Sequence, residues 1–494
     1  MTLEKTLLIL EVSKKQDYIF SSQKLQENVM RSNIIRYVTS DDFFKRCAPN
    51  LYRTEHHMVY SGGGHTILQF DSPEQARSFA ALVTETAMRE FFGLEMFVKQ
   101  MPYDPSRTPG ENLKELSAAL ERKKALRRSG FQRLTFGVDL PPALPPQKID
   151  NDLTQPPQGW EYVTDFSMLA DPQRFLAVVH IDGNAMGQRV QDIYDANTTD
   201  WDSCCQALRQ FSIGIQSNFE TAFQAVAETL AANADHLQLE RPFLPLRPVI
   251  LAGDDVCFVC RGDLGLECAR VFTEQLTATV NDQDQKPYAC CAGVAIVHQK
   301  YPFHRAYALS EELCSNAKRF GAETSRQVSA LDFHIEFGQL KNSLAELRQD
   351  YETDDHNRME LRPLAVVVPS SISMTEELEV RSYGFYRQMW LALRGESGKI
   401  ARSKLKELRS AVKHGMVETE HFMQDKEISN LVEHCFQAQF RTSQRRMEQL
   451  GKILSGDANG FHKPFMRLGS RYRCVLYDAI EMLDHDQTFE EVSL

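Results

Sequence analysis

The same order of predicted secondary-structure elements occurs twice along this chain of 494 residues. Each copy reads strand, helix, two strands joined by a tight turn, helix and strand, which is the βαββαβ order of a ferredoxin-like fold. We therefore expect an α+β protein with two ferredoxin-like domains in tandem, followed by a mostly helical C-terminal domain. The elements of the first copy are expected at 6–12, 23–47, 57–70, 73–92 and 94–101, and those of the second at 175–181, 202–232, 248–259, 264–280 and 289–298.

The hairpin of the second copy carries two adjacent carboxylates at its turn, Asp254 and Asp255. Neighbouring like charges are costly unless a cation neutralises them, and a divalent metal ion is the usual partner. Asp182 ends the first strand of the same copy, and in a ferredoxin-like fold that strand end lies beside the β2–β3 turn. We expect the three carboxylates to meet and to bind two Mg²⁺ or Mn²⁺ ions. A plain turn is the alternative for an isolated Gly-Asp-Asp, because both residue types are common turn formers.

Residues around these carboxylates are suited to hold a triphosphate. Gly253 permits a tight turn and a close approach of the backbone to a phosphate. Gly183 and Gly187 follow the first strand of the second copy and expose backbone N–H groups. Lys318, at the end of the last helix of this copy, is a candidate contact for the phosphates. The pattern indicates phosphoryl transfer on a nucleoside triphosphate.

The first copy differs from the second at its turn. That turn reads Ser61, Gly62, Gly63, Gly64, and His65 follows, so it has no carboxylate. Glu11, at the end of the first strand, is the acidic candidate of this half. We expect the first copy to hold the backbone of a nucleotide without running two-metal chemistry. The two copies would then form an internal pseudo-dimer in which the second half catalyses.

The overall charge and the cysteines narrow the class of protein. A net charge of −11 makes a long nucleic acid an unexpected default partner, because phosphate binding favours a basic surface. Cys257 and Cys260 have CxxC spacing but lack the second pair of a closed zinc site, so we expect the eleven cysteines to be reduced and buried or half-buried. The N-terminus has no signal-peptide pattern, and no apolar run is long enough to span a bilayer. A cytoplasmic location without membrane partners is expected.

Composition divides the rest of the chain. Prolines at 141–146 and 155–159 predict an extended connector. A basic stretch at 112–128 is interpreted as an exposed helix, with nucleic-acid contact as the less favoured alternative. Basic segments at 399–413 and 441–452 are either solvated faces of a helical bundle or a surface for RNA or a partner subunit. The expected domains are 1–140 (first palm-like domain), 141–170 (connector), 171–335 (second, catalytic palm domain) and 336–494 (helical domain).

Four motifs carry a resemblance to a known family: DGNAMG at 182–187, AGDD at 252–255, SKKQDYIF at 13–20 with Leu25 and Ser32, and SGGG at 61–64. They resemble the motifs of the CRISPR-associated Cas10 palm proteins (Csm1 and Cmr2), which are related to the GGDEF and class III nucleotide cyclases. The first is similar to the DGDxMG strand and turn of that family, and the second to its GGDD motif with Ala252 in place of Gly. The other two are similar to the opening and the turn of the family's first palm.

The resemblance implies an enzyme that makes cyclic oligonucleotides from ATP in antiviral defence, with Asp182, Asp254 and Asp255 as metal ligands. It adds Ser13 and Asn184 to the expected nucleotide-binding residues, alongside Ser61–Gly64. The family's N-terminal HD nuclease domain and the zinc module between its palms are not recognisable in the sequence, so no DNA nuclease activity is expected.

Three hypotheses stay open at this point. The chain is either a stand-alone cyclase or the large scaffold subunit of a type III CRISPR-like effector complex, with guide RNA or small helical CRISPR subunits as partners. A conventional nucleotide cyclase of housekeeping signalling is a third reading. Product analysis with each nucleoside triphosphate separates the first reading from the third.

Overall fold

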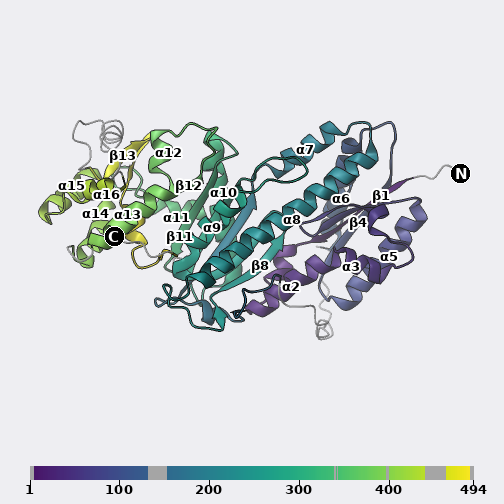
Figure 1. Cartoon of the computed structure of the whole chain (residues 1–494), viewed down its shortest axis with the longest axis horizontal. Helices are drawn as coiled ribbons and strands as arrows, with labels where there is room; N and C mark the ends of the chain where they lie inside the picture. The colour runs from purple at the N-terminus through teal and green to yellow at the C-terminus, as the bar shows by residue number, and fades with distance from the viewer. Residues whose placement is uncertain are drawn as a thin grey trace.

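Two main sheets, the first antiparallel and the second mixed, and a mostly helical C-terminal region lie in a row in the computed structural model of the protein (Figure 1). The structure describes residues 5–131, 153–338, 341, 343–396, 400–439 and 463–489. The prolines at 141–146 and the basic segment at 441–452 lie outside the described residues. The expected fold class, α+β with two ferredoxin-like domains followed by a mostly helical region, is confirmed.

The first sheet has the strand order β2-β3-β1-β4, and all of its neighbours pair antiparallel. This is the order of a ferredoxin-like sheet. The helix expected over 23–47 is wrong in one respect, because two helices occupy this stretch. The first has its C-cap at Thr39, and the side chain of Ser40 caps the second by accepting a hydrogen bond from Phe43 N at 3.3 Å. The elements are β1 (Thr6–Ser13), α1 (Lys15–Ile19), α2 (Leu25–Val38), α3 (Asp41–Cys47), α4 (Thr54–His57), β2 (Met58–Gly62), β3 (His65–Phe70), α5 (Pro73–Glu90), β4 (Glu95–Pro102) and α6 (Pro109–Phe131).

The second sheet contains the same four-strand order and adds two strands. Its order is β12-β11-β10-β6-β9-β8, so that β10-β6-β9-β8 corresponds to β4-β1-β3-β2. The elements are β5 (Glu161–Tyr162), the 3₁₀ helix η1 (Phe166–Leu169), β6 (Phe175–Gly183), α7 (Met186–Ala196), α8 (Trp201–Ala232), β7 (Phe243–Leu244), β8 (Leu246–Ala252), β9 (Asp255–Arg261), η2 (Gly262–Leu264), α9 (Gly265–Thr277), β10 (Cys290–His298), α10 (Phe303–Thr324), β11 (Ser329–Glu336) and β12 (Leu364–Val367).

Both faces of the second sheet are covered, which explains why β6 is apolar without interruption from Phe175 to Val179. Alternate residues of a strand point to opposite faces. Ala177 and Val179 belong to the core shared with α8 and α9, whereas Val178 belongs to the core shared with α10 and the first domain. A strand buried on both sides reads as a continuous apolar run rather than an alternating one.

The two ferredoxin-like domains pack against each other through their long helices. Helix α8 of the second domain packs against β2 of the first, and α2 of the first packs against β8 of the second. Arg36 of α2 forms an ion pair with Glu220 of α8 at 2.7 Å. As a result, the β2–β3 and β8–β9 turns lie on the same side of the interface between the domains. The ends of both first strands also reach this place.

Helix α6 differs from the exposed helix expected over 112–128. Leu113, Leu116 and Leu120 are buried, and Lys124 is only 6% exposed. One face of the helix packs on β4 and β1. The basic residues of this segment are therefore not a purely solvated run.

The C-terminal region is mostly helical and carries one small hairpin. Strand β12, although it precedes most of these helices, belongs to the second sheet through its pairing with β11. All eleven cysteines are free thiols, and ten of them are buried, as expected. Within the described ranges, no helix is long and apolar enough to cross a membrane. The elements are α11 (Leu344–Gln349), α12 (Glu376–Val380), α13 (Tyr383–Glu396), α14 (Arg402–Val412), α15 (Met416–Asp425), α16 (Leu431–Gln439), β13 (Phe465–Leu468), β14 (Arg471–Cys474) and α18 (Tyr477–Glu481).

Candidate active site

Strand register brings the predicted carboxylates together. In the pairing of β6 with β9, Asp182 lies directly opposite Asp255, and Ala252 of β8 lies opposite Asp255 on the other side. The backbone N–H of Gly183 donates to the carbonyl of Asp254 at 3.2 Å, which ties the end of β6 to the turn. Asp182 therefore meets the Asp254–Asp255 pair at one end of the sheet, although more than 70 residues separate them in the sequence.

Burial and the charge of Asp182 disfavour the ionised forms of Asp254 and Asp255. Burial, followed by the charge of Asp182, raises the pKa of Asp255 to about 7 and the pKa of Asp254 to about 6. Lys318 of α10 counters part of this charge: its Nζ lies 2.5 Å from Asp182 Oδ2 and donates to the carbonyl of Gly183 at 3.1 Å. Burial alone lowers the pKa of Lys318, but the adjacent Asp182 more than offsets this and raises it.

The three carboxylates would form an incomplete metal site whose remaining ligands come from a substrate or from water. Among the described residues, no group of three or more His, Cys, Asp or Glu side chains is arranged to hold a metal ion by itself. One oxygen of Asp255, Oδ1, is nevertheless buried without a hydrogen-bond partner, although 47% of the side chain is exposed. Mg²⁺ commonly takes one or two carboxylates and completes its shell with phosphate oxygens and water. The residues present fit a metal that arrives with a nucleotide.

Gln216 of α8 holds the turn of the second domain and was not found by sequence reasoning. Its Oε1 accepts from the backbone N–H of Gly253 at 2.7 Å, and its Nε2 donates to the carbonyl of Leu251 at 3.3 Å. The same Nε2 donates to Glu220 at 2.6 Å, and Glu220 reaches the first domain through Arg36. The available signal was a polar stripe at i, i+4 spacing on this helix, formed by Ser212, Gln216 and Glu220.

The two turns face each other across the domain interface. A Cβ atom placed on Gly253 would lie 3.7 Å from the backbone nitrogen of Gly63. Gly253 has φ +69°, a left-handed conformation that favours glycine, whereas Ala252 is not among the positive-φ residues of the described chain. Lys15 of the first domain donates from Nζ to the carbonyl of Gly63. The Lys15 ammonium also lies close enough to Asp255 to favour its charged form.

The first domain repeats the frame of the second without its turn carboxylates. Glu11 lies opposite His65 in the first sheet, as Asp182 lies opposite Asp255 in the second. Lys124 of α6 is paired with Glu11 at 2.7 Å, as Lys318 is paired with Asp182. The equivalence extends to the residues that follow the first strand.

Two further details support this equivalence. Lys124 follows Phe97, the β4 partner of Glu11, by the same 27 positions that separate Lys318 from Cys291, the β10 partner of Asp182. Lys14 and Ala185, each three residues after the strand carboxylate, have the same left-handed backbone, with φ values of 51° and 59°. The repeat is therefore preserved in backbone detail, although the residue types have diverged.

A cavity of about 840 Å³ opens between the domains at these turns. Of the predicted residues, Ser61, Gly62, Gly63, Gly64 and Asp255 line it. The lining residues that sequence reasoning did not select include the following from the start of α1, from α2 and from α8: Lys14, Lys15, Arg36, Arg209, Gln216 and Glu220.

The remaining predicted residues lie outside this lining. Ser13 is buried at the end of β1. Asn184 donates from its side chain to the carbonyl of Val328 at 3.2 Å, so its amide group supports the loop before β11. Gly183 is packed against Met186 and Asp254, whereas a Cβ atom at Gly187, in the first turn of α7, would meet open space.

Comparisons with known proteins agree with this architecture. The family model described as Cas10/Cmr2, second palm domain, matches residues 175–326. The crystal structure of a Csm1–Csm4 cassette in complex with cA4 aligns with a TM-score of 0.56 at 15% identity, covering 98% of this chain and 70% of that one. The apo cassette aligns with a TM-score of 0.45 at 16% identity, covering 64% of this chain and 53% of that one.

The family match covers the second ferredoxin-like domain, which faces the first across the cavity. The chain is a Cas10-like palm-domain protein, as its motifs indicated. It spans about half of the length of the apo cassette chain that it matches. No curated protein matches the chain.

Proposed function

We propose that this protein is a nucleotidyltransferase that joins nucleoside triphosphates, in particular ATP, into a cyclic oligonucleotide and releases pyrophosphate, as a signal in antiviral defence. The observation that carries the proposal is the pairing of Asp182 with Asp255, beside Asp254, next to a cavity shared by two facing palm turns. The match of residues 175–326 to the Cas10/Cmr2 second palm domain supports it, as does the structural likeness to a cassette that holds cA4.

In this proposal the second palm supplies the chemistry. Asp182, Asp254 and Asp255 hold two divalent metal ions, Mg²⁺ or Mn²⁺. Ions bound there lower the pKa of an attacking 3′-hydroxyl and neutralise charge on the departing pyrophosphate. Lys318, which pairs with Asp182, is the cation that contacts the triphosphate, and Gly183, Asn184, Gly187 and Gly253 belong to the same nucleotide subsite.

The first palm holds the other nucleotide in this proposal. Its turn, Ser61–Gly64, presents a backbone without side-chain bulk, and Lys15 adds a positive charge between the two turns. Ser13 lies at the strand end that orders this surface. A nucleotide held here would place its 3′-hydroxyl toward the α-phosphate of the nucleotide on the second palm, which is the arrangement that internal pseudo-symmetry favours.

The test is incubation of the purified protein with Mg²⁺ or Mn²⁺ and each labelled nucleoside triphosphate, beside the variant Asp254→Ala/Asp255→Ala. We expect pyrophosphate and a phosphatase-resistant product from ATP with the wild-type protein, and neither with the folded variant. Equal turnover in both proteins would contradict the assignment. A parallel set with added RNA covers a requirement for a trigger.

A second candidate function is that of a large scaffold subunit in a type III CRISPR-like complex. The observation that favours it is the alignment of 98% of this chain with a Csm1–Csm4 cassette structure. If the palms act as a scaffold, we expect the chain to co-purify with RNA and small helical subunits. We also expect the Asp254→Ala/Asp255→Ala variant to form a complex as stable as that of the wild type.

A further inference from the structure

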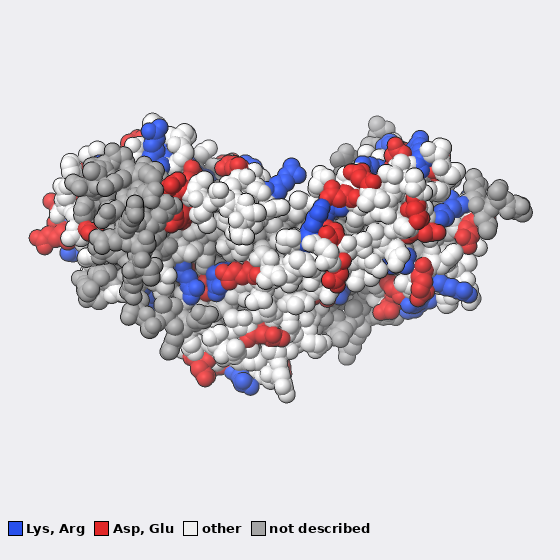
Figure 2. Space-filling view, turned by 45° about the horizontal axis from the view of Figure 1, so that its top comes forward, with Lys and Arg blue, Asp and Glu red and all other residues white. Residues whose placement is uncertain are grey.

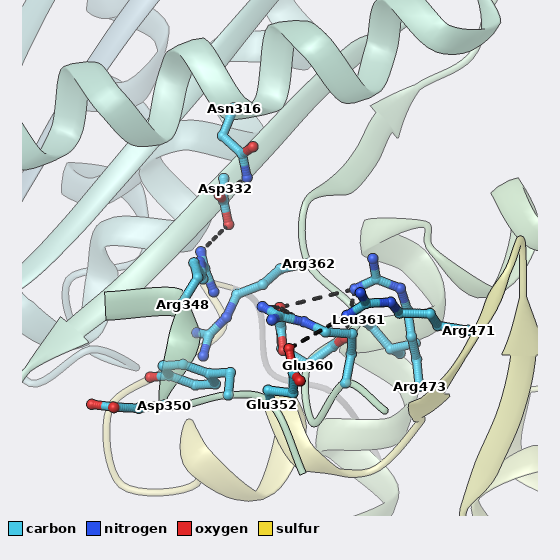
Figure 3. A network of polar contacts seen from close by, with 12 residues as sticks. Asn316, Asp332, Arg348, Asp350, Glu352, Glu360, Leu361, Arg362, Arg471 and Arg473 are labelled. Atoms are coloured by element: carbon cyan, nitrogen blue, oxygen red, sulfur yellow. Dashed lines mark hydrogen bonds and ion pairs between the residues drawn. The ribbon is translucent and has the colours of Figure 1, made fainter. Parts of the chain in front are cut away.

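A second large depression lies between the second palm and the C-terminal hairpin. It has a volume of about 1070 Å³ and is lined by residues of α10, α11, the segment before β12, the end of α12 and the β13–β14 hairpin. Figure 3 shows Arg348 and Arg362 on one side of Glu360, and Arg471 and Arg473 on the other. We call this depression the arginine groove. The arginines that line it are Arg319, Arg348, Arg358, Arg362, Arg381, Arg471 and Arg473.

Part of this charge joins the C-terminal region to the palm. Arg348 donates to the buried Asp332 of β11 at 2.6 Å, and Asn316 of α10 donates to the other oxygen of the same carboxylate at 2.7 Å. Arg362 is fully buried and donates from Nη2 to Glu481 of α18. Buried guanidinium groups need such partners, because an unpaired buried charge is strongly destabilising.

The ion pairs leave guanidinium hydrogen-bonding capacity unused. Within the described residues, Nε and Nη1 of Arg348 and Nη1 of Arg362 are buried and have no hydrogen-bond partner. An arginine has five N–H donors, and a buried donor without an acceptor carries a desolvation penalty. The floor of the groove therefore has more donors than the neighbouring carboxylates satisfy.

Arg381 is buried and Arg473 is half-buried, and the two lie close enough for their charges to interact. Burial, followed by the charge of Arg473, lowers the pKa of Arg381 to about 10. Burial also lowers the pKa of Arg473; the charge of Glu360 opposes this shift, and the nearby Arg358 adds to it. Arg473 donates from Nη1 to the backbone carbonyl of Glu360 at 3.0 Å, while its ion pair with the Glu360 carboxylate is long, at 4.0 Å.

The carboxylates that line the groove are largely engaged by other groups. Glu311 accepts from Tyr307 at 3.1 Å and from Gln16 of the first palm, and Glu312 accepts from the backbone N–H of Leu344 at 2.6 Å. Glu360 accepts two hydrogen bonds from Arg358 at Oε1, whereas its Oε2 is buried without a hydrogen-bond partner among the described residues. Glu377 pairs with Arg381 at 3.3 Å. These acids hold the framework, and the seven arginines that line the groove outnumber the five glutamates in its lining.

The concentration of arginine is local. The chain as a whole has a net charge of −11, and acidic and basic side chains are interspersed over the face shown in Figure 2. Guanidinium groups match the oxygens of a phosphate in a planar, two-pronged manner, which is why arginine predominates where phosphate is recognised. The volume is that of a site for a small ligand or for a short length of a strand.

We propose that the arginine groove binds a phosphate-bearing ligand, separately from the cavity between the palms. The ligand is either a free polyphosphate or nucleotide, or the phosphodiester backbone of a single strand, and both present the same oxygens to Arg319, Arg471 and Arg473. The proposal does not depend on catalysis by the second palm. It assigns to α10 a ligand contact through Arg319, next to Lys318, which serves the carboxylate site.

The binding test compares Arg319→Ala/Arg471→Ala with Arg77→Ala/Arg89→Ala. Arg319 and Arg471 are exposed, so their loss spares the buried ion pairs, and the control removes two exposed arginines from α5. Inorganic tripolyphosphate and a fluorescent 12-nucleotide single-stranded RNA are titrated in EDTA, which prevents metal-dependent binding at the carboxylates. We expect the groove variant to bind at least one probe at least tenfold more weakly than the control does.

The outcome identifies the source of the phosphate. Loss confined to tripolyphosphate points to a free polyphosphate or nucleotide, whereas loss confined to RNA points to a strand. For RNA, the salt dependence of log K should also decrease by about 0.7 for each phosphate contact removed. Equal affinities of the groove variant and the control for both probes would overturn the proposal.

A second measurement on the wild-type protein does not depend on variant folding. Phenylglyoxal modifies accessible guanidinium groups, and mass spectrometry locates the modified residues. We expect the binding probe to protect Arg319, Arg471 and Arg473 while Arg77 stays reactive. Unchanged modification of the three groove arginines would contradict the proposal.

Discussion

The two palms of this molecule share a frame and differ in what that frame holds. Each has a carboxylate at the end of its first strand and a lysine from its last helix on that carboxylate, Glu11 with Lys124 and Asp182 with Lys318. At the facing turn, Gly64 and His65 of the first palm occupy the places of Asp254 and Asp255. The difference shows that the strand carboxylate and its lysine can persist as a structural pair, and that the turn acids distinguish the second palm.

Burial follows the same division. Lys124 is almost fully buried and bonds Glu121 as well as Glu11, so the pair in the first palm is closed. The Asp182–Lys318 pair is about one-third exposed and lies beside two further carboxylates. A closed pair favours stability, whereas an open pair next to additional acids favours exchange of partners with ligands.

Outside the three carboxylates, the largest expected effect comes from the lysines. Lys318→Met should lower pyrophosphate release from ATP by about 10²- to 10³-fold, which is the usual loss when a charge that stabilises a transition state is removed. Lys124→Met should leave turnover within a few-fold of wild type and lower the melting temperature, because it leaves Glu11 without its buried partner. Comparable losses of turnover in both variants would remove the functional distinction between the palms.

The next largest difference is expected between the residues that support the two turns, Gln216 and Ser61. Gln216→Ala removes the side chain that binds the second turn at Leu251 and Gly253. We expect kcat to fall by about tenfold to a hundredfold with a smaller change in KM, because misplaced catalytic groups are costly. Ser61→Ala removes a hydrogen bond from the first turn to the carbonyl of Thr39 and should cost less. Steady-state kinetics of both variants decides the matter. A Gln216→Ala enzyme with wild-type kcat would contradict a positioning role.

Metal binding should depend on pH through the second turn. The raised pKa values of Asp254 and Asp255, about 6 and about 7, mean that both carboxyl groups take up protons as the pH falls through this range and then compete with metal. We expect the increase in melting temperature produced by Mg²⁺ or Mn²⁺ to be larger at pH 8 than at pH 6. An increase independent of pH would place the metal elsewhere.

The smallest expected effect concerns stability without metal. Because the folded-state pKa of Asp255 exceeds its unfolded value, the native state binds more protons, and its stability falls as the pH rises from about 4 to about 7. Asp255→Asn should therefore raise the melting temperature of the metal-free protein by a few degrees at pH 8 and have little effect at pH 5. Glu11→Gln breaks an ion pair and should lower it instead. Thermal unfolding at the two pH values measures both changes.

The repeat and both turns could be predicted from the sequence, because strand period and turn chemistry are local signals. The meeting of Asp182 with Asp255 could be predicted because the repeat indicates a ferredoxin-like topology. The Glu11–Lys124 pair could not, since a lysine in a basic helical run reads as solvated until packing shows which face is buried. Gln216 depends on the approach of α8 to a turn 37 residues away. The arginine groove joins α10 to a hairpin some 150 residues later, a contact that no local pattern specifies.

The most direct test of the comparison between the palms is turnover of ATP by Asp182→Asn and Glu11→Gln, measured side by side under conditions in which the wild-type protein releases pyrophosphate. Both substitutions remove the charge of a strand carboxylate that pairs with a lysine, and they differ only in the palm that they alter. We predict that Asp182→Asn abolishes release and that Glu11→Gln stays within about threefold of wild type, well below the tenfold change that corresponds to 1.4 kcal/mol. Retained release by Asp182→Asn, or equal losses in both variants, would contradict the assignment of catalysis to the second palm.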